Sequence, residues 1–359
     1  MQDETKKKFA SIFSQIKSEH ANLPVNTKKE KNSDILIVDG TNNFIRCWTV
    51  VPTLSDNGDH VGGVTGFLTS LGYAIKLLRP TRVIVVFDGK GGSQRRRKIY
   101  PQYKANRKPP VRLNRAYDLT TDDQEKDNMK FQLITLVEIL ECLPVTIFAL
   151  DSVEADDVIA HLSQLVTIAD GESIIYSTDK DFFQLASDNI KVYNPVKKKT
   201  FSQDVILEDY GIHPKHFHFF RALNGDTSDN INGVKGVGEI SLKKYLPEIA
   251  DPTLDINVEF IRQKYADQKK VPKMIENILN STDIIDRNIK LMDLHEGIMS
   301  SDARIKISNR FHETFPSLNK YALTKLLMKG KLLGAFPRYD EWLSQNFIPL
   351  NRFTNDSTV

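Results

Sequence analysis

Acidic residues recur along this sequence in positions from which several could act on one substrate. Three of them directly follow predicted strands, three more lie within four residues of one another, and a seventh lies two residues after a strand-end acid. Carboxylate oxygens without paired His or Cys side chains suit Mg²⁺ or Mn²⁺ better than zinc. Such a site can hold two ions roughly 4 Å apart, which suits in-line attack of water on a phosphodiester. The seven acids are Asp39, Asp88, Glu154, Asp156, Asp157, Asp179 and Asp181.

Three of these acids end predicted strands. The apolar runs at 35–38 and 83–87 lead directly into Asp39 and Asp88, and a third predicted strand with the sequence Ser173-Ile-Ile-Tyr-Ser-Thr leads into Asp179. The carboxyl ends of parallel strands gather at one edge of a sheet, where open α/β folds place their active sites. A strand-end Asp taken alone is more often a turn residue or a helix N-cap, so the evidence is the coincidence of three.

The group of three acids begins a predicted helix. Glu154 and Asp157 are three residues apart and share a face, with Asp156 beside them. Acids this close repel one another unless a cation or hydrogen bonds compensate. The alternative is an acid-rich first turn that the helix dipole favours. The strand-end acids favour the metal-site interpretation.

The segment between Gly89 and Tyr117 is basic and contains no acid. Its cations could neutralise phosphates, and Tyr100 or Tyr103 could stack on a base, as in single-strand channels. The alternative is a solvated basic loop, but the length of the acid-free run beside the predicted metal site favours nucleic acid. The cations are Lys90, Arg95, Arg96, Arg97, Lys98, Lys104, Arg107, Lys108, Arg112 and Arg115.

A glycine-rich stretch forms a second candidate site. Asp226 and Asp229 precede Gly233, Gly236 and Gly238, and a predicted helix follows. Closely spaced glycines that open a helix expose backbone N–H groups, which can hold a phosphate without reading sequence. The glycine run alone is as often an ordinary turn, but the two acids before it and the cations around it favour binding. These cations are Lys235, Lys243 and Lys244.

The order of the predicted elements indicates the fold class and the domains. Short β-branched runs alternate with helical patterns up to residue 177, which indicates a doubly wound, mostly parallel α/β sheet. Helices joined by glycine-rich turns predominate after Lys199. The helices expected are 64–78, 130–143, 153–166, 204–210, 214–223, 240–246, 271–291 and 321–333. The domains expected are a basic extension (1–33), an α/β core (34–200) with a basic arch around 89–130, a helical subdomain (201–300), and a C-terminal helical segment with a polar tail (301–359).

Composition excludes several classes of protein. The chain has 359 residues of which 40% are hydrophobic, enough to bury a substantial core. No apolar run approaches the roughly 20 residues that span a bilayer. The two cysteines, Cys47 and Cys142, form no metal-binding pair, which predicts a reducing, cytoplasmic compartment. Within 1–33, Phe9, Ile12, Phe13 and Ile16 fall at helical spacing, and this segment could dock on the core, bind a partner or be disordered.

Together these motifs resemble the 5′-nucleases, a family that includes bacteriophage 5′-exonucleases, flap endonucleases and the 5′-nuclease domain of bacterial DNA polymerases. The resemblance covers 35–246. Its blocks follow in the family's order: Ile-Val-Asp39-Gly-Thr-Asn, Val-Phe-Asp88-Gly, Tyr103-Lys104-Ala-Asn-Arg107, Val-Glu154-Ala-Asp156-Asp157, Ser-Thr-Asp179-Lys-Asp181 and Asn-Gly-Asp226-Thr-Ser-Asp229-Asn with Gly233-Val-Lys-Gly236-Val-Gly238.

The resemblance implies a PIN-like sheet with a basic arch and a helix-three-turn-helix subdomain that grips duplex DNA. It implies that the seven acids, with Asp226 and Asp229, hold two Mg²⁺ or Mn²⁺ ions, and that Lys104 and Arg107 place and polarise the scissile phosphate. It also implies a potassium ion bound by backbone carbonyls of the glycine hairpin. The other DNA contacts expected are Arg46, Arg97, Tyr103, Gly233, Lys235, Gly236, Gly238, Lys243 and Lys244.

One position departs from the family pattern. The residue six positions after Asp39 is often aromatic in relatives and is Ile45 here, with Phe44 before it and Arg46 after it. Which of these side chains meets the terminal nucleotide stays open.

The function expected is a structure-selective 5′-3′ exonuclease or flap endonuclease that leaves 5′-phosphate and 3′-hydroxyl ends and removes flaps or RNA primers, an RNase H activity, in replication. The stand-alone format suggests a monomeric phage protein in the host cytoplasm. The partners expected are DNA with a 5′ flap or 5′ end, RNA/DNA hybrid, single-strand binding protein and the sliding clamp, and no membrane. The alternatives are a PIN-type ribonuclease, which generally lacks the arch and the glycine hairpin, and a non-catalytic DNA-binding module, whose acids would be eroded.

Overall fold

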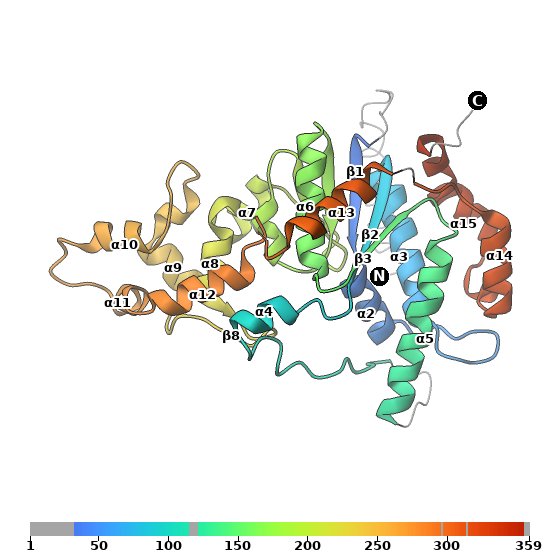
Figure 1. Ribbon diagram of the computed structural model, residues 1–359, viewed down its shortest axis with the longest axis horizontal. Helices are drawn as coiled ribbons and strands as arrows, with labels where there is room; N and C mark the ends of the chain where they lie inside the picture. Colours follow the sequence, from blue (N-terminus) through green and yellow to red (C-terminus); the bar gives the residue numbers. More distant parts are fainter. Residues whose placement is uncertain (1–31, 115–120, 296, 314, 355–359) are drawn as a thin grey trace, which may run out of the picture. The chain divides into compact units, whose positions relative to one another are not determined.

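The computed structural model describes residues 32–114, 121–295, 297–313 and 315–354 (Figure 1). The helix expected around Phe9 to Ile16 and the last five residues of the polar tail lie outside the described residues. No helix in the described part of the chain is long and apolar enough to cross a membrane.

A six-stranded sheet carries the site. Its strand order is β3-β2-β1-β4-β5-β6, and only β6 is antiparallel to its neighbour. The predicted mostly parallel α/β sheet is therefore confirmed. The last two strands were not expected, because they are short and carry several lysines. The strands are β1 Asp34–Asp39, β2 Arg82–Asp88, β3 Thr146–Leu150, β4 Glu172–Tyr176, β5 Ile190–Asn194 and β6 Lys199–Phe201.

Helices cover both faces of this sheet. On one face α6 (Ala155–Ile168) packs against β1, β2 and β4. On the other, α2 (Gly40–Val50), α3 (Gly62–Leu78) and α5 (Asp122–Leu140) share a second core cluster. Successive side chains of a strand point to opposite faces, so Ile35 joins the first cluster and Leu36 the second. Because both faces are covered, the central strands read as unbroken apolar runs.

Strand β1 passes into α2 without a loop. Asp39 ends the strand, and its carboxylate accepts a hydrogen bond from the Asn42 N–H at 3.0 Å, which caps the helix. The interpretation of Asp39 as an N-cap is thus realised in the fold. The cap also fixes the Asp39 side chain at the carboxyl edge of the sheet.

The basic segment contains a short helix, α4 (Gln94–Ile99), and an irregular run that leads toward α5. Helix α5 begins earlier than the predicted 130–143, because Thr121 and Gln124 form a capping box.

The region after β6 is helical and shares its core with the sheet. A single hydrophobic cluster runs from β1, β2 and α6 into α8 and α12, so the division near residue 200 stays a prediction. The helix predicted over 271–291 is wrong: it breaks at Asn280 and Ser281, residue types that favour helix ends over interiors. The elements are α7 Gln203–Tyr210, α8 Phe217–Asn224, β7 Gly225–Asp226, β8 Ile231–Asn232, α9 Glu239–Tyr245, α10 Val258–Tyr265, α11 Lys273–Leu279 and α12 Thr282–Met292.

The C-terminal segment joins both faces of the sheet. Helix α13 (Ser301–His312) packs on α6, whereas α14 (Lys320–Lys329) and α15 (Tyr339–Asn346) lie beside α5 and α3 (Figure 1). Where the segment crosses between the faces, the buried Arg82 donates to the Phe311 carbonyl at 2.7 Å. The segment is thereby part of the packed core.

Candidate active site

A cavity of about 280 Å³ lies at the carboxyl ends of β1, β2 and β4, beside the start of α6. Four of the nine predicted metal-site acids line it, and we call them the cavity acids: Asp39, Asp88, Asp156 and Asp179. Lys104 and Arg107 of the basic segment line the same cavity. The structure thus brings the strand-end acids and the two predicted phosphate-binding cations together.

Asp39 is the most buried of the cavity acids, with 4% of its surface exposed. Its carboxylate accepts hydrogen bonds from the Asn42 N–H at 3.0 Å and the Ser177 hydroxyl at 2.9 Å. Burial, together with the negative charges of Asp179 and Asp88, raises the pKa of Asp39 to about 7 against the effect of these hydrogen bonds. The environment of Asp39 therefore disfavours the ionised form of its carboxylate.

Asp156 and Asp179 show the same electrostatic strain. Burial raises the pKa of Asp156 well above its usual value, and the charges of Asp179 and Asp39 add to the effect. Burial also raises the pKa of Asp179, although its carboxylate accepts a hydrogen bond from the Asp181 N–H at 2.8 Å. Mutual repulsion among buried carboxylates is the physical signature of a cation site.

Asp88 is exposed and is tied to the start of α6. Its carboxylate accepts a hydrogen bond from the Ala155 N–H at 2.9 Å, and its own N–H donates to the Thr41 hydroxyl at 2.9 Å. These bonds connect the end of β2 to α6 and α2, so three elements converge on the cavity.

The other five predicted acids each contact an Arg or Lys side chain, and we call them the paired acids: Glu154, Asp157, Asp181, Asp226 and Asp229. No ion pair joins a cavity acid to Arg or Lys in the described part of the chain. The nine acids therefore form two electrostatic classes that the sequence did not separate.

Arg96 is the main partner of two paired acids and was not singled out by the sequence. It is 3% exposed, and its guanidinium contacts Glu154 at 2.6 Å and Asp157 at 2.7 Å. Arg96 Nε also donates to the Leu291 carbonyl at 2.8 Å. Burial disfavours the Arg96 cation, but the charges of Asp157 and Glu154 outweigh it, so the pKa of Arg96 is raised. No local signal distinguishes Arg96 from its neighbours in the Arg-Arg-Arg run.

Lys104 and Arg107 reach the cavity while paired with acids. Lys104 Nζ lies 2.6 Å from Glu154, and Arg107 lies 2.6 Å from Asp229. Burial raises the pKa of Glu154, but the charges of Arg96 and Lys104 outweigh it and the net shift is downward. Glu154 and Asp229 thus orient the two cations that face the cavity.

Tyr103 corrects one expectation. Its ring is 3% exposed and packs with Ile231, Leu291 and Met292, and its hydroxyl donates to Glu154 at 3.0 Å. Stacking of Tyr103 on a base is therefore wrong for this structure, because the ring belongs to the core beneath the basic segment. The half-buried Tyr100 lies under the Arg287 guanidinium, 4.3 Å from its ring centre.

Arg221 links the sheet edge to the helical region. Its guanidinium contacts Asp181 at 2.5 Å and Asp226 at 2.6 Å. Burial and the Asp179 charge still raise the pKa of Asp181 to about 7, against the effect of Arg221. Hydrogen bonds from Ser228 and the Arg221 charge lower the pKa of Asp226 against its burial. Sequence reasoning missed Arg221, which immediately precedes the motif that carries Asp226.

The donor set of the cavity acids fits a hard divalent cation. It consists of oxygen atoms alone, and a cation would relieve both the burial of charge and the repulsion between carboxylates. In the described part of the chain, no three His, Cys, Asp or Glu side chains converge tightly enough to hold one ion as they stand. The carboxylates surround the cavity instead of meeting at one point.

The glycine hairpin separates into a packed part and an open part. A Cβ at Gly233 would meet the Asn224 carbonyl oxygen at 2.2 Å, so this glycine serves close packing against the C-terminal end of α8. Gly236 has a φ of 80°, and Gly238 has open space around it. Asn277 of α11 donates to the Lys235 carbonyl at 2.8 Å. Lys244 lines the shallow hollow beside Gly236 and Gly238, whereas Lys243 pairs with Glu239.

Of the remaining expected contacts, Arg46 lines the cavity and Arg97 does not. Ile45 and Arg46 line the cavity, whereas Phe44 is buried in the core beneath α2. Arg97 is exposed on α4. Three side chains could meet the terminal nucleotide where relatives often have an aromatic residue. Of these three, only Ile45 and Arg46 are therefore available to a ligand.

Comparisons with known proteins agree with this architecture. Residues 34–211 match the family model described as 5′-3′ exonuclease, N-terminal resolvase-like domain. A 5′-3′ exonuclease of Aquifex aeolicus is 33% identical over 216 residues, which are 59% of this chain and 69% of that protein. The thermostable DNA polymerase I of Thermus thermophilus is 34% identical over 220 residues, 61% of this chain but only 24% of the polymerase.

A solved structure shares the fold. The phage T5 5′-exonuclease with bound zinc superimposes with a TM-score of 0.58, at 22% identity, over 84% of this chain and all of that chain.

Proposed function

Because the chain belongs to the 5′-3′ exonuclease family, we propose that this 5′-nuclease selects DNA with a 5′ flap or 5′ end, or an RNA-primed end, and depends on two divalent ions. The observation that carries the proposal is the single cavity in which four unpaired carboxylates face Lys104 and Arg107. Carboxylates suit hard cations and the two basic groups suit a phosphate, so one cavity offers both halves of a phosphodiester site.

The cavity acids would hold the ions, with Asp181 beside them. Bound there, Mg²⁺ or Mn²⁺ would activate the attacking water and offset charge on the leaving oxygen. Asp39 is held for this task by the Ser177 hydroxyl and the Asn42 N–H, and Asp179 by the Asp181 N–H. Fixed ligand orientation raises ion affinity because little order is lost on binding.

Lys104 and Arg107 would hold the scissile phosphate and offset its transition-state charge. Their partners Glu154 and Asp229 restrain them, and Arg96 restrains Glu154 in turn. The backbone bond from the Lys104 N–H to the Asp229 carbonyl, at 2.9 Å, fixes the basic segment on the turn that carries Asp229. Glu154 and Asp229 therefore act as positioning residues.

The glycine hairpin would bind the duplex part of the substrate. The open backbone at Gly236 and Gly238 can approach a phosphate, with Lys235 and Lys244 nearby. The Ser241 hydroxyl lies 3.1 Å from the Gly236 carbonyl and 3.0 Å from the Gly238 carbonyl. These gathered oxygens support the proposed potassium ion at this turn.

Product mapping tests the proposal. A 5′-labelled flap DNA and a nicked duplex with a 5′ RNA segment should both be cut with Mg²⁺ and spared with EDTA, leaving 5′-phosphates. Cleavage that survives EDTA would contradict the metal dependence. Equal cutting of substrates with and without a 5′ end would contradict the selectivity.

A further inference from the structure

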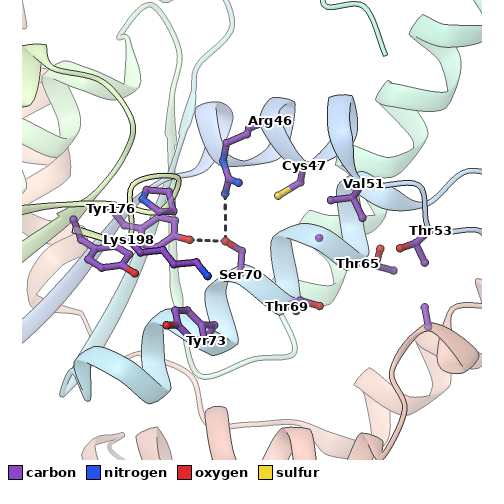
Figure 2. Close-up of a pocket in the computed structure, with 14 residues that line it drawn as sticks. Arg46, Cys47, Val51, Thr53, Thr65, Thr69, Ser70, Tyr73, Tyr176 and Lys198 are labelled. Atoms are coloured by element: carbon purple, nitrogen blue, oxygen red, sulfur yellow. Dashed lines mark hydrogen bonds between the residues drawn. The ribbon is translucent and has the colours of Figure 1, made fainter. Parts of the chain in front are cut away.

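A second, larger cavity lies beside the active site, between α2, α3 and the turn that joins β5 to β6. Its volume is about 480 Å³. Arg46 lines both this cavity and the one that holds the cavity acids. We call it the side pocket, and Figure 2 shows the residues that line it.

The side pocket is cationic. None of the fourteen residues that line it is acidic, and two of them, Arg46 and Lys198, are basic. Neither cation forms an ion pair with any described residue. Figure 2 shows Arg46 and Lys198 directed toward Ser70 from different elements. An anion could therefore reach two uncompensated positive charges here without meeting a carboxylate.

Arg46 is held but not satisfied. Its guanidinium donates to the Ser70 hydroxyl at 3.3 Å and to Asn43, and Ser70 shares a short hydrogen bond with the Tyr176 hydroxyl. The Arg46 Nε is buried and has no hydrogen-bond partner among the described residues. Buried donors in folded proteins are nearly always satisfied, so this group is short of an acceptor.

The pocket also offers an aromatic ring and hydroxyl groups. Tyr73 is 51% exposed at its wall. Thr53 and Thr69 supply hydroxyls, whereas the buried Thr65 already donates its hydroxyl to the Val61 carbonyl. A base can stack on such a ring while the hydroxyls bond to base or sugar edges. The volume is in the range of small-ligand sites and exceeds what a free phosphate fills.

From these features we infer that the side pocket binds a nucleoside phosphate, with the phosphate between Arg46 and Lys198 and the base at Tyr73. This inference rests on the proposed function, because the shared Arg46 connects the pocket to the reaction cavity. The nucleotide has two sources: one unit of the substrate DNA, or a free mononucleotide released by cleavage.

Binding of dTMP to the full chain in EDTA tests the pocket without cleavage. Lys198→Glu should weaken dTMP binding, followed by isothermal titration, about tenfold or more, since a charged partner becomes a repelling one. Lys197→Glu is the matched control, because Lys197 lies on the same turn but does not line the pocket. Tyr73→Ala should also weaken binding, and Tyr73→Phe should restore it.

Absence of dTMP binding, or equal weakening by Lys197→Glu and Lys198→Glu, would overturn the inference. The DNA arm separates the two sources. If a substrate nucleotide occupies the pocket, Lys198→Glu raises the KM for flap DNA and dTMP competes with the flap. If the pocket takes only free mononucleotide, Lys198→Glu weakens dTMP binding and leaves the KM for flap DNA unchanged. Wild-type cleavage of the flap is scored separately, so failure of the proposed function is not confused with failure of the pocket.

Discussion

The cavity acids and the paired acids sit within one site but under opposite electrostatic conditions. Burial and mutual repulsion raise the pKa of Asp39, Asp156 and Asp179, whereas protein cations lower the pKa of Glu154. No cavity acid forms an ion pair in the described part of the chain, whereas every paired acid contacts an Arg or Lys side chain. The difference teaches that the same residue type can be left available for an ion in one class and be held by a protein cation in the other.

Asp181 lies between these classes. It touches Arg221, yet burial and the nearby Asp179 keep its pKa raised to about 7. It is therefore the paired acid best placed to exchange its protein cation for an ion.

Removal of a cavity acid should have the largest effect. Asp179→Asn should lower kcat more than about 100-fold, since even changes beyond the direct ligands of a metal cost 10–100-fold, while flap DNA still binds. Single-turnover cleavage and a DNA-binding titration measure the two quantities. Asp170→Asn is the control, because Asp170 is exposed beyond the opposite end of α6. Comparable losses of kcat in Asp179→Asn and Asp170→Asn would contradict a specific role of the cavity acids in the reaction.

Removal of the cation from a paired region should affect folding before chemistry. Arg96→Met leaves Glu154 and Asp157 buried without that partner, which should lower the free energy of unfolding by about 3–5 kcal/mol. Arg97→Met on the exposed side of the same helix should change it by less than about 0.5 kcal/mol. Urea unfolding measures both. Equal stability of the two variants would mean that the buried pair contributes nothing.

The pH dependence of stability should expose the cavity acids. The pKa of Asp39 is raised from 3.8 to about 7 in the folded state, so the folded protein binds the proton more tightly than the unfolded chain. The contribution of Asp39 to the free energy of unfolding therefore falls by about 2–4 kcal/mol as the pH rises from about 4 to about 7 in EDTA. Above pH 7 this contribution stays low. Asp39→Asn should flatten this loss, and Mg²⁺ should stabilise the wild type more at pH 8 than at pH 5.5. If the free energy of unfolding depends on pH in the same way in the wild type and in Asp39→Asn, the predicted contribution of Asp39 is contradicted.

Arg221 should compete with an ion for Asp181 and Asp226. Arg221→Met should tighten Mn²⁺ binding in the absence of DNA by about threefold to tenfold, because two carboxylates lose their internal partner. Mn²⁺ titration followed by electron paramagnetic resonance reads this without cleavage. Arg107→Met provides the comparison, because Arg107 is mostly exposed and pairs only with Asp229. Unchanged or weaker Mn²⁺ binding in Arg221→Met would assign Arg221 a purely structural role.

The sequence predicted the members of the site better than their roles. Asp39, Asp88 and Asp179 could be placed together because each ends a parallel strand. Lys104 and Arg107 could be chosen from the ten cations of the acid-free run only through the resemblance to the 5′-nucleases. Arg96 could not be chosen from three successive arginines. Helix geometry sends Arg95 to the Ile298 carbonyl, Arg96 to the buried acids and Arg97 to the exposed surface. The helix predicted over 271–291 breaks at Asn280 and Ser281, a local signal in the sequence that the prediction missed.

What the sequence by itself determined is strands β1 to β4 and the acids at their edge, because strand pattern and strand ends are local properties and parallel strands necessarily share their carboxyl edge. Only the tertiary structure decided which carboxylates receive a protein cation. Arg96 meets Glu154 across 58 positions and the Leu291 carbonyl across 195, and contacts of that range depend on how the elements pack. The division between acids left for an ion and acids held by the protein is therefore a product of the fold.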